Sequence, residues 1–239
     1  MRTLYATYLL ALGGLLATFT AQAQHLQAIG VAGSFNISQS QVREPGLQLG
    51  SYYLQPATRR PRLDDTGNRL SVYARVGLGK GHYFAQPELA YTSTLSSKYT
   101  LSYPGDPGPA SAPDYESASS ASFGYRMRRA ELAALVGRHF SSHFYVLAGP
   151  VLAWQHQQSA TGTSGTAAVY RSLYSAVVPV QLLGQVGLGL QAGRLDLGLR
   201  YEHSLTPYTS QVTYQGQTQD FRQHTSQVIF SVGALLCKK

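Results

Sequence analysis

The chain has 239 residues, enough for one domain with a sizeable core, and its net charge at pH 7 is +8. Charged residues make up only 13% of it, about half the usual share, whereas glycine (24) and tyrosine (17) are abundant. The basic residues are dispersed, which argues against a nucleic-acid partner, and a single cysteine excludes an internal disulfide framework. No paired Cys/His spacing indicates a metal site, and we expect no cofactor.

The first 23 residues have the pattern of a secretory signal peptide. Arg2 precedes an apolar run from Tyr8 to Ala17, and Ala21-Gln22-Ala23 puts small residues where a signal peptidase cleaves. A membrane anchor is the alternative, but the run is short for a spanning helix. We therefore expect cleavage after Ala23 and a single domain over residues 24–239.

Eight segments have the alternation or the apolar, β-rich composition of strands. In chain order they cover residues 27–37, 69–79, 82–93, 123–138, 143–156, 179–192, 194–204 and 225–236. Short connections around Gly81, Ser141 and Gly193 alternate with four long ones. The long connections, such as SATGTSGTAA (159–168), have the composition of solvated, flexible loops. This alternation predicts an all-β fold: an eight-stranded antiparallel up-and-down barrel in an outer membrane, with short periplasmic turns and long extracellular loops.

The segment 193–205 raises the question of which face of each strand is outside. Leu195, Leu197 and Leu199 alternate with Asp196 and Arg200. In a membrane barrel the leucines face lipid, whereas in a soluble, lipocalin-like periplasmic barrel they would enclose an apolar cavity. The polar faces are rich in Gly, Gln, Ser and Tyr and nearly lack lysine, which suits a narrow, packed interior. We therefore expect the leucines to face lipid.

Aromatic residues recur on the expected lipid face at a fixed spacing. Tyr83 and Tyr91 lie eight residues apart on one face of a predicted strand, and Phe144 and Trp154 lie ten apart on another. At about 3.3 Å per residue and a tilt of roughly 40°, these separations project to about 20–25 Å, close to the height of a lipid-facing band. We predict that these four residues and Tyr201 form aromatic girdles.

Charged residues on the inward face need partners, because an unpaired buried carboxylate is costly. The heights of these residues in the barrel can be counted in residues from the short turns. Glu88, Glu131, Gln185 and Arg200 lie at similar heights, whereas Arg75 lies lower and Glu202 higher. We expect Glu88 and Glu131 to pair with Arg75 and Arg200, either as a structural filling of the barrel, which we favour, or as a gate or proton path. The predicted interior network comprises Arg75, Glu88, Glu131, Gln185, Arg200 and Glu202. Pro87 lies in the same strand as Glu88 and predicts a local bulge.

Several stretches resemble the outer-membrane β-barrel domain proteins common in Bacteroidota, the PorT-like barrels, which are related in shape to OmpA-like and OmpX-like ones. The stretches are QPELAY (86–91), RAELAALVG (129–137), FYVLAGP (144–150), VGLGLQAGRLDLGLRYEHSL (186–205) and the closing VIFSVGALL. The resemblance covers about residues 27–236 and implies an outer-membrane barrel folded by the barrel-assembly machinery. Strands of this family often end on an aromatic residue, whereas this chain ends Leu-Leu-Cys-Lys-Lys.

Two motifs invite a chemical interpretation. Glu202, His203 and Ser204 superficially resemble a catalytic triad, but neighbours on a strand point to opposite faces, and no G-x-S-x-G turn is present. In the first long loop, Arg59, Arg60 and Arg62 could contact lipopolysaccharide phosphates or a partner protein, although such a run more often pairs internally with nearby aspartates.

The sequence therefore predicts a monomeric, non-enzymatic outer-membrane barrel in contact with outer-membrane lipid and lipopolysaccharide. Its function would lie in the long loops, as surface binding, adhesion or envelope integrity. The alternatives are a lipid-modifying barrel enzyme, acting as a lipid A acylase or deacylase, and the soluble barrel described above. We expect no catalytic residue in the leading interpretation.

Overall fold

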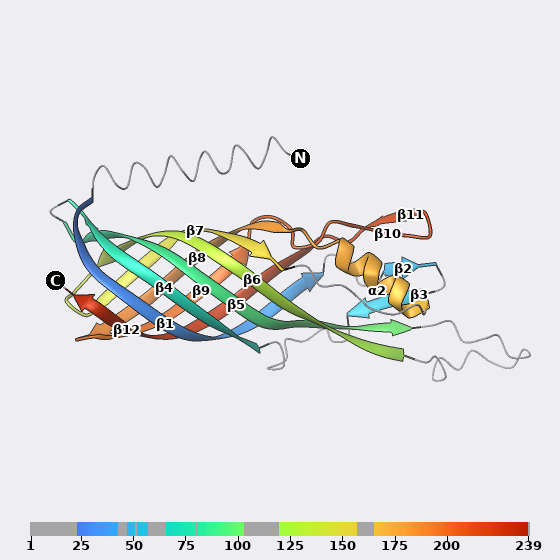
Figure 1. Cartoon of the computed structure of the whole chain (residues 1–239), viewed down its shortest axis with the longest axis horizontal. Helices are drawn as coiled ribbons and strands as arrows, with labels where there is room; N and C mark the ends of the chain where they lie inside the picture. Colours follow the sequence, from blue (N-terminus) through green and yellow to red (C-terminus); the bar gives the residue numbers. More distant parts are fainter. Residues whose placement is uncertain are drawn as a thin grey trace, which may run out of the picture.

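The computed structural model describes residues 23–42, 47–50, 52–56, 66–79, 81–102, 120–156 and 165–238. Eight long antiparallel strands pair in the order β5-β4-β1-β12-β9-β8-β7-β6, and β5 pairs with β6 to close the barrel (Figure 1). The fold class predicted from the sequence is confirmed, and each of the eight predicted segments contains or overlaps one strand. The strands are β1 (Ala23–Val42), β4 (Thr66–Leu78), β5 (Tyr83–Ser102), β6 (Ser120–His139), β7 (Phe144–Gln155), β8 (Val180–Ala192), β9 (Leu195–Ser204) and β12 (Gln223–Lys238).

One end of the barrel holds the three tight turns, at residues 79–82, 140–143 and 193–194, together with the start of β1 and the end of β12 (Figure 1). We call it the short-turn end. Gly79 and Gly193 have positive φ angles of 66° and 61°, a conformation that glycine adopts at no steric cost. The long connections all join strands at the opposite end, as the sequence predicts.

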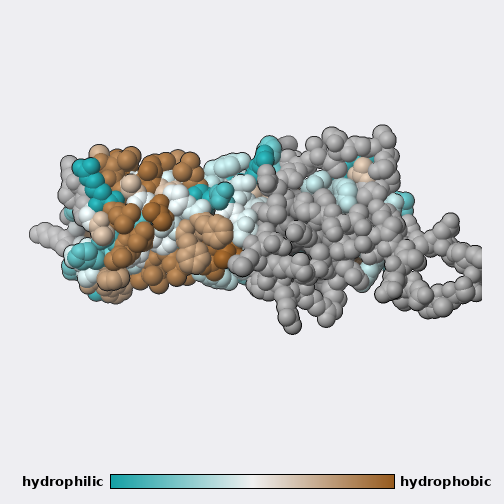
Figure 2. Space-filling model, turned by 90° about the horizontal axis from the view of Figure 1, so that it is seen from below, coloured by the Kyte–Doolittle hydropathy of each residue, from teal (hydrophilic) through white to brown (hydrophobic). Residues whose placement is uncertain are grey.

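The wall of the barrel is apolar outside and polar inside. In β4, Leu70 and Val72 are 66% and 51% exposed, whereas Ser71, Tyr73 and Arg75 are buried in the interior. On the face seen in Figure 2, hydrophobic residues accordingly form a broad band over the outside of the barrel. The leucines of β9 also face outward, so the lipocalin-like alternative, which needs them around an internal cavity, is wrong.

The connections at the other end fold into a small second unit, which we call the head. It consists of β2 (Leu47–Leu49), β3 (Tyr52–Pro56), α2 (Gly165–Ser175), β10 (Gln211–Tyr214) and β11 (Gln217–Asp220). Strand β3 pairs with the far end of β5, and α2 lies beside the two hairpins (Figure 1). Its core comprises Leu47, Leu49, Leu54, Met127, Val169, Leu173, Ala176, Val177, Tyr208, Val212, Tyr214 and Phe221.

The helix corrects the prediction of a flexible loop over residues 159–168, because α2 begins at Gly165. Ala167, Val169 and Leu173 are buried against the head, so an apolar face on one short helix stabilises this part of the connection. Among the described residues, no helix is long and apolar enough to cross a membrane.

The bulge expected at Pro87 is also a wrong prediction. Pro87 pairs with Ala134 of β6 without a register shift. On its other side, the pairs Tyr73–Glu88 and Val76–Ala85 keep the same register, and only the ladder between them is interrupted. The missing N–H is therefore accommodated by a gap in one ladder while the strand keeps its alternation.

Candidate functional site

The barrel interior holds eight buried charged side chains among the residues that the structure describes. Four are arginines and four are carboxylates, so their formal charges cancel. Because these side chains are almost fully buried, each ion needs a partner of opposite sign. They are Arg69, Arg75, Arg129, Arg200, Glu88, Glu131, Asp196 and Glu202.

The half of this interior nearer the head contains a continuous chain of ion pairs. Arg69 donates to Glu88 at 2.6 Å and to Glu131 at 2.9 Å, and Arg200 donates to Glu88 at 2.8 Å. Glu131 also accepts from Arg129 at 2.6 Å. Each carboxylate thus bridges two guanidinium groups from different strands, which links four strands across the barrel.

Glu202 lies at the head end of this chain. It accepts a hydrogen bond from Arg129, one from Gln227 at 2.7 Å and one from Gln185 at 3.3 Å. Gln185 also accepts from Arg200 at 3.3 Å. The Gln185 amide therefore joins Arg200 to Glu202, which form no direct ion pair with each other.

A second centre lies nearer the short-turn end, around Asp196. Asp196 accepts hydrogen bonds from Arg75 at 2.7 Å, from Tyr145 at 2.8 Å and from Tyr73. The Arg75 guanidinium carbon lies 4.2 Å from the centre of the Tyr145 ring, a cation–π contact. Arg75 donates further to Gln86 at 2.8 Å.

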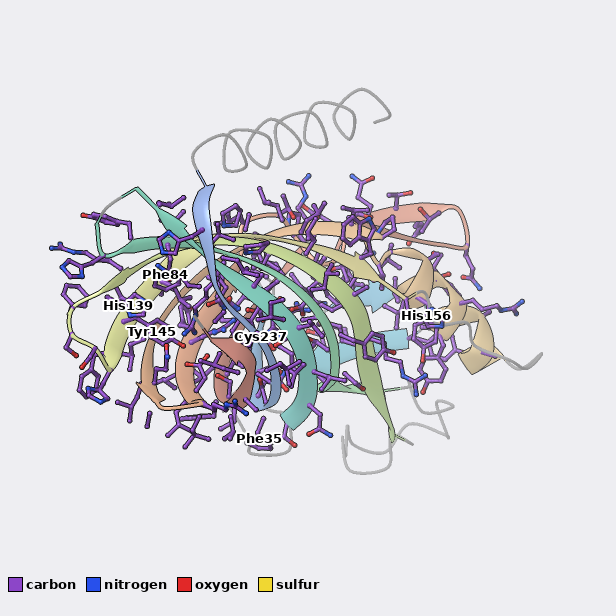
Figure 3. All side chains as sticks on the ribbon, turned by 60° about the vertical axis from the view of Figure 1, so that its left-hand side comes forward. Phe35, Phe84, His139, Tyr145, His156 and Cys237 are labelled. Atoms are coloured by element: carbon purple, nitrogen blue, oxygen red, sulfur yellow. The ribbon has the colours of Figure 1, made fainter. Side chains whose placement is uncertain are left out.

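Aromatic rings fill the short-turn end of the interior. The rings of Phe84, His139 and Tyr145, from β5, β6 and β7, form a triangle with centroid distances of 4.8, 5.7 and 5.8 Å (Figure 3). Leu135, Leu147 and other apolar side chains pack with Phe84. The interior is thus packed with side chains from one layer to the next.

The predicted interior network is brought together in part. Glu88 meets Arg200 as expected, and Gln185 and Glu202 belong to the same network. The expectation that Arg75 pairs with Glu88 or Glu131 is wrong, because Arg75 lies nearer the short-turn end and pairs with Asp196. Glu131 pairs instead with Arg69 and Arg129.

Three charged members were missed by the sequence interpretation: Arg69, Arg129 and Asp196. The sequence did contain a signal for them, since each occupies one of the alternate positions of its strand whose side chains point into the barrel. Arg69 shares a face with Arg75, Arg129 shares one with Glu131, and Asp196 alternates with the outward leucines.

The aromatic residues expected at the girdles are all exposed on the outside of the barrel. Tyr83 and Phe144 lie at the short-turn end, and Tyr91, Trp154 and Tyr201 lie toward the head. The exposed wall between these two levels carries aliphatic side chains such as Leu89, Val186 and Leu188.

The triad-like Glu202, His203 and Ser204 do not form a catalytic arrangement. Glu202 points into the interior network, whereas His203 lies 2.8 Å from Ser226 of the neighbouring strand. Ser204 lies 3.4 Å from His224, and the rings of His203 and His224 stack at 6.2 Å. Within the described part of the chain, neither histidine bonds a carboxylate, so each serine–histidine pair lacks the third group of a triad.

The head offers an exposed surface at the end of the molecule. Tyr53 of β3 is exposed, and Arg222 and Asp220 form an exposed ion pair at 3.3 Å. Beneath this surface, burial raises the pKa of the Tyr214 phenol, and Tyr52 adds to the shift. The rings of Tyr52 and Tyr214 contact edge to face at 6.1 Å, which fixes one hairpin against the other.

Some predictions fall outside the described residues. The proposed loop contacts Arg59, Arg60 and Arg62 do, and so does the predicted signal peptide up to residue 22. In the ranges that the structure describes, no group of three or more His, Cys, Asp or Glu side chains could hold a metal ion.

No protein-family model and no curated protein matches the sequence. Several solved structures are similar to this chain. One is the attachment invasion locus protein of Yersinia pestis, solved in complex with the heparin analogue sucrose octasulfate. It is 12% identical, with a TM-score of 0.39, and the alignment covers 87% of this chain and 99% of that one. The outer membrane protein OprG from Pseudomonas aeruginosa is 6% identical, with a TM-score of 0.39 and coverage of 89% and 97%. An outer membrane channel from Pseudomonas putida F1 is 11% identical, with a TM-score of 0.35 and coverage of 90% and 97%. At these TM-scores the similarities carry no statement about the function of this chain.

Proposed function

We propose that the chain is a non-enzymatic integral barrel protein of a Gram-negative outer membrane and that its head acts at the cell surface. The role assigned to the head is surface binding, adhesion or envelope integrity.

The single observation that carries the proposal is the apolar outer wall bounded by aromatic residues at two levels. Large apolar side chains such as Leu70, Leu89 and Val232 are 60–66% exposed. A water-soluble protein rarely exposes a continuous apolar surface of this kind. A closed barrel also satisfies its strand hydrogen bonds internally, which is the condition for crossing a lipid bilayer with strands.

The filled interior supports a function outside the barrel rather than through it. The charges cancel, and the rings of Phe84, His139 and Tyr145 pack together inside the short-turn end, so the wall encloses packed side chains. Structural filling is therefore the role we assign to this network. Among the described residues, the folded head is the part of the chain that extends beyond the barrel, and we assign the surface role to it.

The other elements of the proposal come from the sequence. A signal peptide cleaved after Ala23 would export the chain, and the barrel-assembly machinery would fold it as a monomer. Arg59, Arg60 and Arg62 would contact lipopolysaccharide phosphates or a partner protein only where they are not paired with the nearby aspartates, which is the more common arrangement for such a run. Membership of the PorT-like barrels of Bacteroidota rests on the resemblance of the strand stretches given above.

The first experiment is gel migration of the mature chain from the membrane fraction, with and without boiling. A barrel with internally satisfied hydrogen bonds resists the detergent until it is heated, so we expect a shift on boiling. Recovery of the chain from the soluble periplasm with no heat-dependent shift would contradict the proposal.

A further inference from the structure

We propose that the short-turn end binds the phosphate of an anionic phospholipid at Arg138, in the periplasmic leaflet of the membrane. The inference rests on the proposed function, since it requires the barrel to span an outer membrane. It adds a ligand class and a binding residue at the end of the barrel that lies opposite the head.

Arg138 is held between two aromatic rings on the lipid-facing wall. It pairs across the strands with Tyr83, and its guanidinium carbon lies 5.4 Å from the centre of the Tyr83 ring and 5.4 Å from that of Phe140. All three side chains are exposed. Stacking orients a guanidinium and leaves its N–H edge free, which is the edge that binds a phosphate in a bidentate manner.

Among the described residues, no aspartate or glutamate side chain is exposed at this end of the molecule. Of the eleven acidic residues in the sequence, four are the interior carboxylates, Asp220 is in the head, and the other six belong to the connections that join strands at the head end. Among the described residues, Arg138 therefore has no carboxylate partner. A lipid phosphate would supply the missing opposite charge.

The other Lys and Arg side chains near this end add positive charge. Arg194 is exposed in the β8–β9 turn, and its carbonyl accepts a hydrogen bond from Leu235 at 2.8 Å. The sequence adds Lys80 in the β4–β5 turn and the terminal residues Lys238 and Lys239. Exposed basic side chains such as Arg138 and Arg194, near an aromatic belt, attract anionic lipid.

The test uses the full mature chain folded in a zwitterionic detergent. Native mass spectrometry counts retained phosphatidylglycerol, with phosphatidylcholine, whose phosphate is neutralised by its own choline, as the zwitterionic comparison. The variants are R138Q, R138K and the control R128Q. Arg128 is a matched control because it lies exposed on the same strand, ten residues toward the head.

We expect the wild type to retain phosphatidylglycerol in preference to phosphatidylcholine. R138Q should bind phosphatidylglycerol about fivefold more weakly, R138K should fall between the two, and R128Q should match the wild type. Equal retention of the two lipids by the wild type would overturn the inference, as would equal losses in R138Q and R128Q.

A heat-dependent gel shift measured on the same samples separates this inference from the proposed function. A sample that shifts on boiling but shows no lipid preference overturns the lipid site alone. A wild-type sample that shows no shift overturns the membrane barrel itself.

Discussion

Two inward-facing glycines of the barrel wall lie directly opposite aromatic residues of the neighbouring strand. A Cβ added to Gly137 would come within 2.2 Å of the Phe84 ring, and one added to Gly189 within 2.0 Å of the Tyr145 ring. The rings therefore occupy space that any larger residue would need, and the small and large residues form complementary pairs across the strands.

Substitution G189A tests this packing. The added methyl group must displace the Tyr145 side chain. The hydroxyl of Tyr145 donates to Asp196 at 2.8 Å, and its ring lies against the Arg75 guanidinium. We expect a destabilisation of about 1–3 kcal/mol, the usual cost of overpacking. The urea midpoint of the heat-shifting form measures it. The control is G33A, since a Cβ at Gly33 meets nothing within 4 Å, and equal effects of the two variants would contradict the prediction.

Substitution R129Q tests the ion pairs of the interior. It leaves Glu202 with amide partners only, because the other hydrogen bonds of Glu202 come from Gln185 and Gln227. Removing one partner of a buried pair costs about 3–5 kcal/mol. The double variant R129Q/E202Q restores neutrality, so it should recover most of the loss in the same urea titration. A double variant no more stable than R129Q would show that charge balance is not what matters there.

The inward position of these charges follows from the sequence, but their pairing does not. Period-two alternation places Glu88, Glu131 and Arg200 on the inner face, and the structure has them there. Which charge meets which depends on the stagger between strands, and that is a property of the closed barrel. Arg75 consequently lies beside Asp196 instead of beside Glu131.

At the scale of elements, strands were predictable where the alternation was regular, and their ends were not. The predicted strand over 82–93 continues to Ser102, because β5 and β6 remain paired beyond the apolar wall. The polar composition of that extension resembles a loop, and its pairing partners lie 18 or more residues further along the chain. Contacts of that kind leave no local pattern in the sequence.

Helix α2 was missed for a similar reason. Its eleven residues follow a stretch rich in Ser, Thr and Gly, and a helix of this length is marginal in isolation. Its apolar face is stabilised by β2 and β10, whose sequences are more than 30 residues away. Two short hairpins and a short helix thus depend on one another.

Substitution L173A tests that dependence. Leu173 is buried in the head core, and truncating such a residue costs about 2–5 kcal/mol. We expect the head to become sensitive to protease while the barrel keeps its heat-dependent gel shift. R171A is the control, because Arg171 is exposed on the same helix. Loss of the gel shift in L173A would mean that the head and the barrel unfold as one unit.

At the scale of the whole molecule, charge differs between the barrel interior, its outer wall and its two ends. The interior of the barrel is neutral, its outer wall carries no acidic side chain among the described residues, and the acidic residues outside the interior belong to the head end. The short-turn end is basic in sequence. Such a distribution distinguishes the two ends, and we expect the basic end to face the periplasm and the head to face the cell exterior.

The orientation can be measured with the single cysteine. Cys237 is exposed at the short-turn end, so a membrane-impermeant maleimide should label it only after the outer membrane is breached. In a C237S background, Q217C puts a thiol on the exposed hairpin β10–β11 of the head, and this variant should react in intact cells. Labelling of Cys237 in intact cells together with protection of Q217C would reverse the orientation. The head would then face the periplasm, and a role at the cell surface would be excluded.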